Sequence, residues 1–527
     1  MTSKPGMSQP TLYVKNRGIV TICLMIATLM QALDSTIANV ALPYMQGSLS
    51  ASYDEVTWVL TSYVVMAAIM TAPVGWMALR FGRKNLFVSC IIGFTITSMM
   101  CGIATNLPEM VLDRLLQGAF GAALVPLSQS TLMDIYPLEK RGMAMSIWGM
   151  GVMVGPILGP TLGGYLTEHF SWRYVFFVNL PFGIAATLGL MFLLPKRKLA
   201  SVARFDWIGF GVLSLGLSGL QIALDRGQEL DWLSSNFIIT CFILAVLGFY
   251  LFIVHMLTAK DPFVPRAVFQ DRNLVAGLVA MFFVGMVLLA STTLMAPFLE
   301  NMANYPVETA GLIMAPRGFG TIFAMIVVGR LTERVDPRLL MLIGYVLMGW
   351  SLRMQQFWSP DTSITYMVET IVIQGFGMGL IFVPLQVAAF YTLAPDLRTQ
   401  GTSFLNLIRN VGSAIGISIT TALLSHATQY MHADISQVIK PFWRPLQVGG
   451  AVSHFLNPQT PGGAAFLDQI VNYQAQIIAY MNDFKFMSLM AIPGILSLLL
   501  MRKRAKPVAM AAKPRDTEAG PSHSFID

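Results

Sequence analysis

The stretch Gln31–Pro43, QALDSTIANVALP, decides the fold, because it places a carboxylate inside a long apolar segment. A run of about 20 apolar residues crosses a bilayer as a helix. A carboxylate at the centre of such a helix costs at least about 2.5–3.5 kcal/mol, so Asp34 must serve a purpose that an apolar residue cannot. Gln31, Ser35 and Asn39 recur every fourth residue beside this acid, which predicts a polar helix face turned toward a helix bundle or a cavity.

Two interpretations fit this acid. In the first, Asp34 is the coupling site of a transporter, where a proton binds and leaves. In the second, it is a structural residue that is protonated or paired with a neighbouring helix. Ionisable residues inside membrane spans mark ion and substrate pathways by default, so we prefer the first interpretation.

The composition indicates an integral membrane protein. Of the 527 residues, 55% are hydrophobic and only 12% charged, with a mean hydropathy of +0.63, whereas soluble domains carry about 25% charged residues. The net charge of +7 comes from short basic clusters between apolar runs, which is typical of cytoplasmic loops and predicts no nucleic-acid binding. The four cysteines lack metal-ligand or disulfide spacing, so no metal is expected.

The apolar runs predict an all-α integral membrane protein with fourteen transmembrane helices. The first run is too long for a cleaved signal and is expected to be a retained span. The predicted spans lie near residues 18–41, 56–79, 86–105, 109–132, 143–165, 174–195, 206–224, 236–257, 274–298, 310–331, 338–357, 364–391, 403–425 and 484–501.

Basic residues predict the orientation of these spans. Most of the 34 lysines and arginines fall in alternate connecting segments, and these segments include both ends of the chain. The positive-inside rule then places both termini in the cytoplasm, which requires an even number of spans. The basic residues assigned to outer segments are Arg173, Arg226, Arg317, Arg353, Lys440, Arg444 and Lys485.

The chain repeats itself, which predicts two related halves of six spans each. Gln117-Gly118, followed by Val125-Pro126-Leu127, recurs as Gln374-Gly375, followed by Val383-Pro384-Leu385. Two further spans have no counterpart in either half. The expected units are an N-terminal bundle at 1–200, a two-helix insert and linker at 201–272, a C-terminal bundle at 273–503 with an outer loop at about 426–483, and a disordered cytoplasmic tail at 504–527.

An arginine in the fourth predicted span is the expected partner of the buried acid. Counting along the helices at about 1.5 Å per residue places Arg114 and Asp34 at similar depths below the outer surface. Gln117 follows Arg114 on the same helix face. An arginine nearby and desolvation act in opposite directions on a carboxylate, which leaves it poised to titrate. A static ion pair, or a local pair between Arg114 and Asp113, is the alternative.

The fifth predicted span carries a glycine groove. Its glycines recur every four residues and would let helix backbones approach closely. Prolines next to two of them allow a kink, so we expect a hinge or a seal, with simple tight packing as the alternative. The residues of this expected hinge are Gly151, Gly155, Pro156, Gly159 and Gly163.

The short loop after the second span predicts a cytoplasmic gate between two moving bundles, beyond its role in fixing topology. The same pattern recurs in the second half, where Glu333 occupies the position that Leu79 has in the first half. The expected gate residues are Gly75, Arg80, Gly82 and Arg83 in the first half, and Glu333 and Arg334 in the second.

At these residues the chain resembles the major facilitator superfamily, and within it the fourteen-span drug:proton antiporters of the EmrB/QacA type. The resemblance covers nearly the whole chain. It rests on Leu33–Pro43, the Arg80/Gly82/Arg83 loop, Arg114 with Gln117-Gly118, Gly155-Pro156 with Gly163-Gly164, Trp172–Pro181, Phe205–Gly209, Asp225–Gln228 and Asn406 with Arg409–Gly412. One departure is Leu79, where the gate loop of the family usually has an acidic residue.

The resemblance implies a major facilitator fold with two inserted helices, proton coupling by Asp34 and Arg114, and a leak-preventing role for Gly155-Pro156. It also implies a bacterial inner-membrane protein that works with an EmrA-like periplasmic adaptor and an outer-membrane channel.

The expected function is export of amphipathic compounds in exchange for protons, with no cofactor other than the proton gradient. No P-loop, zinc spacing or nucleophile elbow is found, so no enzyme activity is expected. Alternatives are export of one metabolite class, such as a fatty acid, a siderophore or a plant phenolic, and an uncoupled facilitator. Arg409 is expected to hold an anionic substrate or to pair with Glu369. The expected cavity residues are Gln31, Asn39, Gln117, Glu369, Gln374, Asn406 and Arg409.

Overall fold

Helices cover every predicted apolar run in the computed structural model of the chain. The structure describes residues 12–137, 140–195, 204–332, 334–438 and 460–502, and within these ranges the regular elements are all helical. Residues at the starts of several helices cap them: the side chains of Asn106, Asp206, Asp271 and Ser363 each accept a backbone N–H three residues further on.

The first half, called the N-half below, contains ten helical segments. These are α1 (Arg17–Ser48), α2 (Tyr53–Val56), α3 (Trp58–Thr71), α4 (Val74–Phe81), α5 (Arg83–Ile103), α6 (Leu107–Gly121), α7 (Leu124–Ile135), α8 (Arg141–His169), α9 (Tyr174–Phe177) and α10 (Asn179–Leu193). The second span is bent by 58° between α3 and α4, where Pro73 removes a backbone donor.

The insert and the second half follow in chain order. The insert has α11 (Trp207–Arg226), η2 (Trp232–Ser234) and α12 (Asn236–Thr258). The second half, called the C-half below, has α13 (Ala267–Gln270), α14 (Arg272–Pro297), η3 (Phe298–Met302), α15 (Val307–Met314), α16 (Pro316–Leu331), α17 (Pro337–Gln355), α18 (Ile364–Ala389), η4 (Pro395–Leu397), α19 (Arg398–Val438), α22 (Pro461–Leu489) and α23 (Ala491–Leu498).

By length and apolarity, 10 of the described helices can cross a membrane, or up to 11 if α3 and α4 form one span. The predicted runs 143–165, 338–357 and 484–501 are helical but fall outside that set. The number of fourteen spans therefore stays a prediction.

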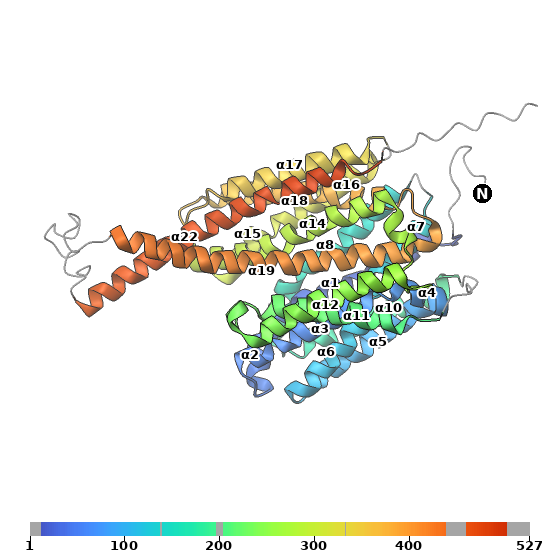
Figure 1. Ribbon diagram of the computed structural model, residues 1–527, viewed down its shortest axis with the longest axis horizontal. Helices are drawn as coiled ribbons and strands as arrows, with labels where there is room; N and C mark the ends of the chain where they lie inside the picture. The colour runs from blue at the N-terminus through green and yellow to red at the C-terminus, as the bar shows by residue number, and fades with distance from the viewer. Residues whose placement is uncertain (1–11, 138–139, 196–203, 333, 439–459, 503–527) are drawn as a thin grey trace, which may run out of the picture.

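The two halves lie side by side along the long axis of the molecule (Figure 1). In each half, the first helix pairs with the fifth: α1 packs on α8, and α14 packs on α19. α8 also contacts α16 and α18 of the C-half. The insert helices pack on each other, and α11 lies against α3, where Thr61 donates a hydrogen bond to Asp225.

Helices occupy the described parts of the predicted outer loop at 426–483, and its position outside the membrane stays a prediction. α19 continues without a break to Val438, and α22 begins at Pro461, before the predicted last span. The two helices contact each other, with His432 and Asp468 2.8 Å apart. They project beyond the other helices at the left of the view, at the end away from α4 and α7 (Figure 1). Residues 439–459, which include Lys440 and Arg444, lie outside the described residues, as does the tail at 503–527.

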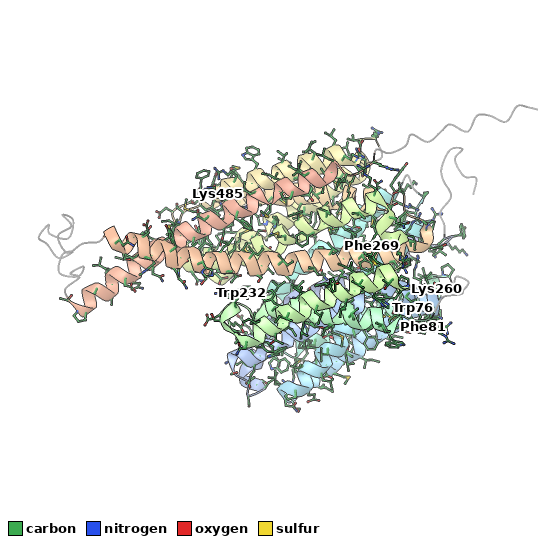
Figure 2. All side chains as sticks on the ribbon, in the orientation of Figure 1. Trp76, Phe81, Trp232, Lys260, Phe269 and Lys485 are labelled. Carbon is green, nitrogen blue, oxygen red and sulfur yellow. The ribbon has the colours of Figure 1, made fainter. Side chains whose placement is uncertain are left out.

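Aromatic and basic side chains mark the two ends of the helix bundle (Figure 2). Trp76, Phe81 and Lys260 lie together at the end near the start of the chain, and Trp232 lies at the other end of the insert. The segment that carries Trp76 and Phe81 also carries Arg80, Arg83 and Lys84, so the positive-inside rule predicts that this end faces the cytoplasm, and the name cytoplasmic end is used below for this expectation.

Candidate functional site

The predicted acid and arginine meet in the interior of the N-half. Asp34 on α1 is 0% exposed and Arg114 on α6 is 1% exposed. Arg114 Nη1 donates to Asp34 Oδ2 at 2.7 Å, and Arg114 Nε donates to the carbonyl oxygen of Val59 on α3 at 3.0 Å. The ring of Tyr63 lies under the guanidinium, 4.2 Å from its Cζ. Arg114 of α6 therefore contacts both α1 and α3.

Two amides complete the surroundings of the carboxylate. Gln117 Nε2 donates to Asp34 Oδ1 at 2.8 Å, while its Oε1 accepts from Arg114 Nη1 at 2.8 Å. Asn179 Nδ2 donates to the same carboxylate oxygen at 3.2 Å and to Ser98 Oγ at 3.0 Å. Each of these three side chains thus donates to Asp34, which is the arrangement that suits an ionised carboxylate.

Asp113 is not the partner of Arg114, so that alternative is wrong. Asp113 is 2% exposed, and its Oδ2 has no hydrogen-bond partner among the described residues. The role of Asn179 was not predicted, although this residue lies in a quoted motif. Its only signal in the sequence was an amide at the start of an apolar run.

The glycine groove of α8 faces the helix that carries Asp34. A Cβ on Gly155 would lie 2.7 Å from the Cβ of Ala32, and one on Gly159 would lie 2.9 Å from the Cβ of Thr36. These contacts are tighter than side chains allow, so the groove lets α1 and α8 touch backbone to backbone. Gly163 and Gly151 continue the groove against Ile37 and Met25.

α8 runs as one unbroken helix past the predicted hinge. The side chain of Pro156 lies outside the described set, so the hinge stays a prediction. The same contact recurs in the C-half, which was not predicted. A Cβ on Gly412 or Gly416 of α19 would lie 3.1 Å or 2.8 Å from backbone Cα atoms of α14. The sequence does contain a signal for this contact. Gly412 and Gly416 follow Gln374 by the same intervals as Gly155 and Gly159 follow Gln117.

A cluster of charges, called the latch below, joins the halves at the cytoplasmic end. Asp134 on α7 accepts from Arg83 of α5 at 2.5 Å and from Arg398 of α19 at 2.7 Å. Arg83 also donates to Thr399 at 3.0 Å. Asp134 is 2% exposed. One carboxylate therefore holds an arginine from each half, and the cytoplasmic end is closed.

Further contacts between the halves continue along α19 and α8. Asn406 Nδ2 donates to Gln129 Oε1 of α7 at 2.7 Å. A Cβ on Gly142 would lie 2.7 Å from Thr332 Oγ1, and one on Gly75 would lie 2.9 Å from the Cα of Gln400. Gly75 thus belongs to the closed gate, as predicted by its place in the loop.

The other predicted gate residues are less involved. Gly82 has a positive φ of 84°, which turns the chain between α4 and α5 and so aims Arg83 at the latch. Arg80 and Arg334 are exposed, and Glu333 lies outside the described residues. Asp134 and Arg398 carry the gate instead. They were missed because Asp134 lies in a part of the repeat where the two halves have different residue types.

Two half-buried arginines lie in the C-half without a carboxylate partner among the described residues. Arg317 of α16 donates to Thr292 Oγ1 at 2.6 Å, Ser291 Oγ at 3.1 Å and the carbonyl oxygen of Leu288 at 3.1 Å. Arg317 was assigned to an outer segment, which is wrong: it lies in α16, inside the predicted run 310–331. Arg409 of α19 contacts Asn410 at 3.3 Å.

Helix periodicity places Arg409 near the side of α19 that contacts the N-half. Asn406 lies three residues earlier on α19 and contacts α7, so Arg409 lies on the same helix face, one turn further from the latch. Arg317 and Arg409 both flank α14, because the backbone of Arg409 touches Gly285 and the side chain of Arg317 touches Leu288. Both arginines thus lie next to α14 of the C-half.

The remaining predicted cavity residues have mixed positions. Gln31 is half-buried, with its amide 3.5 Å from the Tyr63 hydroxyl. Asn39 is exposed, and so is Glu369, which does not pair with Arg409. Gln374 is buried and contacts Gln355 at 3.5 Å inside the C-half. Among the described residues, no group of histidines, cysteines and acids could hold a metal ion.

Three comparisons with known proteins agree with this architecture. The sequence profile "Major Facilitator Superfamily" matches residues 24–417. "Multidrug export protein EmrB" of Escherichia coli (strain K12) is 34% identical over 484 residues, which cover 92% of this chain and 94% of EmrB. "Fatty acid resistance protein FarB" of Neisseria gonorrhoeae is 35% identical over 437 residues, covering 83% of this chain and 86% of FarB.

A solved structure shows the same fold. The crystal structure of the human organic anion transporter MFSD10 (TETRAN) matches with a TM-score of 0.58 at 12% identity, covering 92% of this chain and 99% of that one. The chain therefore belongs to the Major Facilitator Superfamily, as an EmrB-like member.

Proposed function

We propose that this protein exports amphipathic compounds across the bacterial inner membrane in exchange for protons, by alternating access. The observation that carries the proposal is the buried Asp34–Arg114 pair. Its helix, α1, touches α8 through the glycine groove, and α8 in turn touches the C-half through Ser146, beside Gly329. A change at Asp34 therefore has a continuous packed path to the surface between the halves.

Protonation is expected to act by breaking this pair. A protonated Asp34 no longer attracts Arg114, and a buried arginine without its partner is destabilising by about 3–5 kcal/mol. Ionised Asp34 therefore favours the conformation in which the cytoplasmic end is closed. A proton shifts the balance between facing states only by as much as it binds one state better than the other.

The substrates are proposed to be amphipathic compounds, because EmrB is named for multidrug export and FarB for fatty acid resistance. Arg317 and Arg409 favour anionic ones, because a guanidinium binds carboxylates in a forked geometry. A relative named for fatty acid resistance makes a fatty acid the preferred alternative to a broad drug range. A siderophore or a plant phenolic is a further alternative, and an uncoupled facilitator is the alternative mechanism.

The proposed setting is an inner membrane with both termini in the cytoplasm. The helical extension formed by α19 and α22 then projects on the periplasmic side, where a periplasmic adaptor and an outer-membrane channel would join the pump (Figure 1). No covalent change of the substrate is proposed.

Proton release tests the coupling. Purified protein in proteoliposomes with a trapped pH dye is given decanoate or decyltrimethylammonium, which share a tail and differ in the sign of the head. We expect substrate addition to release protons from the wild type and not from Asp34→Asn. Transport of substrate with no proton movement in the wild type would favour the uncoupled facilitator.

A further inference from the structure

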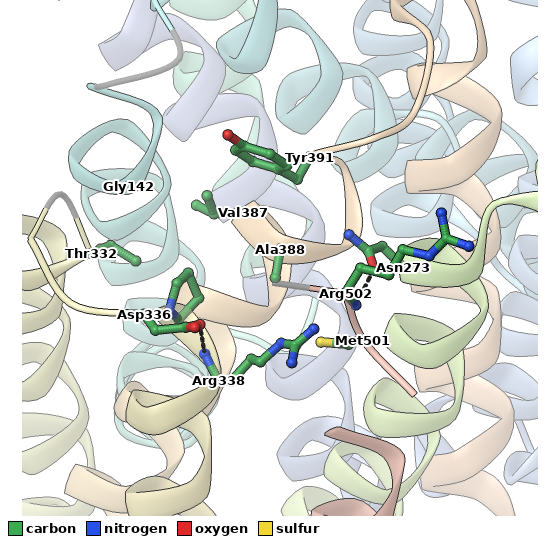
Figure 3. A pocket seen from close by; sticks show the side chains of 11 residues that line it. Gly142, Asn273, Thr332, Asp336, Arg338, Val387, Ala388, Tyr391, Met501 and Arg502 are labelled. Atoms are coloured by element: carbon green, nitrogen blue, oxygen red, sulfur yellow. Dashed lines mark hydrogen bonds between the residues drawn. The ribbon is translucent and has the colours of Figure 1, made fainter. Parts of the chain in front are cut away.

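A pocket lies at the cytoplasmic end of the C-half, bounded by the N-half (Figure 3). Gly142 of α8 comes from the N-half, and Thr332, Arg338 and Tyr391 come from the C-half. Asn273 closes one side, where it accepts the backbone N–H of Arg502 at 2.8 Å. Ligand binding here would therefore touch both halves.

The sequence repeat shows what this pocket corresponds to. Arg338 is in the first turn of α17, as Arg83 is in the first turn of α5. Tyr391 follows Gln374 by the same interval as Asp134 follows Gln117. The pocket therefore lies where the N-half has its Arg83–Asp134 pair, and the C-half has no acid at the corresponding position.

Arg338 has the donors that such an acid would satisfy. Its Nε and Nη2 are buried and have no hydrogen-bond partner in the part of the chain that the structure describes. The nearby acid, Asp336, is used otherwise, since its Oδ1 accepts the backbone N–H of Arg338 at 3.1 Å and caps α17. Buried guanidinium donors left without acceptors are rare in folded proteins. An anionic group from outside the chain would supply the missing acceptor.

The rim of the pocket points to a lipid. Leu339 follows Arg338 and is 51% exposed, and Leu500 precedes Met501 of the pocket and is 46% exposed. Leucines exposed on a membrane protein at this position face acyl chains. Arg338 lines the pocket, and basic pockets on the cytoplasmic side of helix bundles bind anionic headgroups.

We infer that this pocket binds the phosphate of an anionic phospholipid of the cytoplasmic leaflet. The phosphate accepts from Arg338 as Asp134 accepts from Arg83, and it completes a second latch. Because Gly142 belongs to the other half, the bound lipid stabilises the arrangement in which the cytoplasmic end is closed. Anionic lipid thereby regulates the facing equilibrium, independently of what is transported.

Native mass spectrometry of the full chain tests binding. The protein is taken from nanodiscs that contain either phosphatidylcholine alone or a mixture with phosphatidylglycerol. We expect the wild type to retain one phosphatidylglycerol, and Arg338→Gln to retain it about tenfold less, because one charge-assisted hydrogen bond is worth about a factor of ten. Arg334→Gln, which removes the same charge outside the pocket, is the matched control. Equal losses in both variants would overturn the site.

Conformation is measured with spin labels on Phe81→Cys and Arg330→Cys, which are exposed on different halves. Labelling is selective because all four native cysteines are buried. We expect phosphatidylglycerol to increase the closed population of the wild type and not that of Arg338→Gln. The same effect from inorganic phosphate in phosphatidylcholine discs would overturn the lipid as the source.

Tyr391→Asp tests the same inference while Arg338 is kept. It places an acid where the N-half has Asp134. We expect this variant to favour the closed state without anionic lipid and to lose its response to phosphatidylglycerol. A full lipid response in Tyr391→Asp would contradict the inference.

Discussion

The two halves of the molecule place arginines in opposite surroundings. In the N-half, Arg114 pairs with Asp34 at 2.7 Å, and Arg83 pairs with Asp134 at 2.5 Å. In the C-half, Arg317 contacts hydroxyl and carbonyl oxygens, and Arg338 has two guanidinium nitrogens without partners among the described residues. Arg83 and Arg338 fall at corresponding positions of the repeat, whereas Arg114 and Arg317 do not.

The contrast at the centre follows from a rearrangement of residue types. Arg317 precedes Gly329 by the interval at which Tyr63 precedes Gly75, so the C-half has an arginine where the N-half has the aromatic ring under Arg114. Ile371 takes the place of Arg114 beside the shared glutamine. Under the proposed function, the N-half responds to a proton and the C-half offers positive charge to a ligand.

The largest expected effect comes from removing the acid of the N-half. Asp34→Asn keeps the shape of the side chain and an oxygen that can accept from Gln117 and Asn179, but it cannot release a proton. We expect proton-driven export to be abolished, with the protein still present in the membrane. Export assays and immunoblots of the same cells check this result, and full export by the Asp34→Asn variant would refute the coupling role.

The next effect tests the glycine contacts that both halves share. A valine at Gly159 or at Gly416 would collide with α1 or α14, at a cost of about 1–3 kcal/mol each. We expect both variants to lose thermal stability, but only Gly159→Val to transport without moving protons. Gly164→Ala, with nothing within 4 Å of its Cβ, is the neutral control. Equal coupling in both valine variants would show that the groove beside Asp34 only holds helices together.

A smaller effect is expected from giving the C-half the acid that it lacks. Ser291→Asp places a carboxylate beside Arg317, whose Nη2 lies 3.1 Å from the serine oxygen. The new pair would occupy the guanidinium and weaken decanoate binding about tenfold, with decyltrimethylammonium unaffected or bound more tightly. Equilibrium binding in nanodiscs measures both. Unchanged decanoate affinity would remove Arg317 from the substrate site.

The smallest effect is expected at the latch. Arg398→Gln removes one of the two arginines on Asp134, while Arg83 remains. We expect the ratio of closed to open protein to fall by a factor of about 5, which corresponds to the lower end, about 1 kcal/mol, of coupling energies of this kind. Spin-label distances between the halves report the change. A larger effect of Arg398→Gln than of Asp134→Asn would contradict a latch centred on the carboxylate.

Much of this protein could be predicted from local properties of the sequence. The length of the apolar runs predicts the helices, because a bilayer requires about 20 apolar residues per span. The cost of a charge in lipid identifies Asp34 and Arg114, and counting residues along helices predicts that they meet. The glycine spacing predicts a close helix contact without naming the partner helix.

Only the tertiary structure decides which distant residues share a site. Asp134 and Arg398 are far apart in the chain and meet because the halves close on each other at the cytoplasmic end. Arg317 is distinguished from a loop arginine by its contacts with α14. The outer segment is helical because α19 and α22 support each other, which a proline-interrupted sequence does not show. The sequence shows that burying a charge costs free energy, but only the tertiary structure shows which group pairs with that charge.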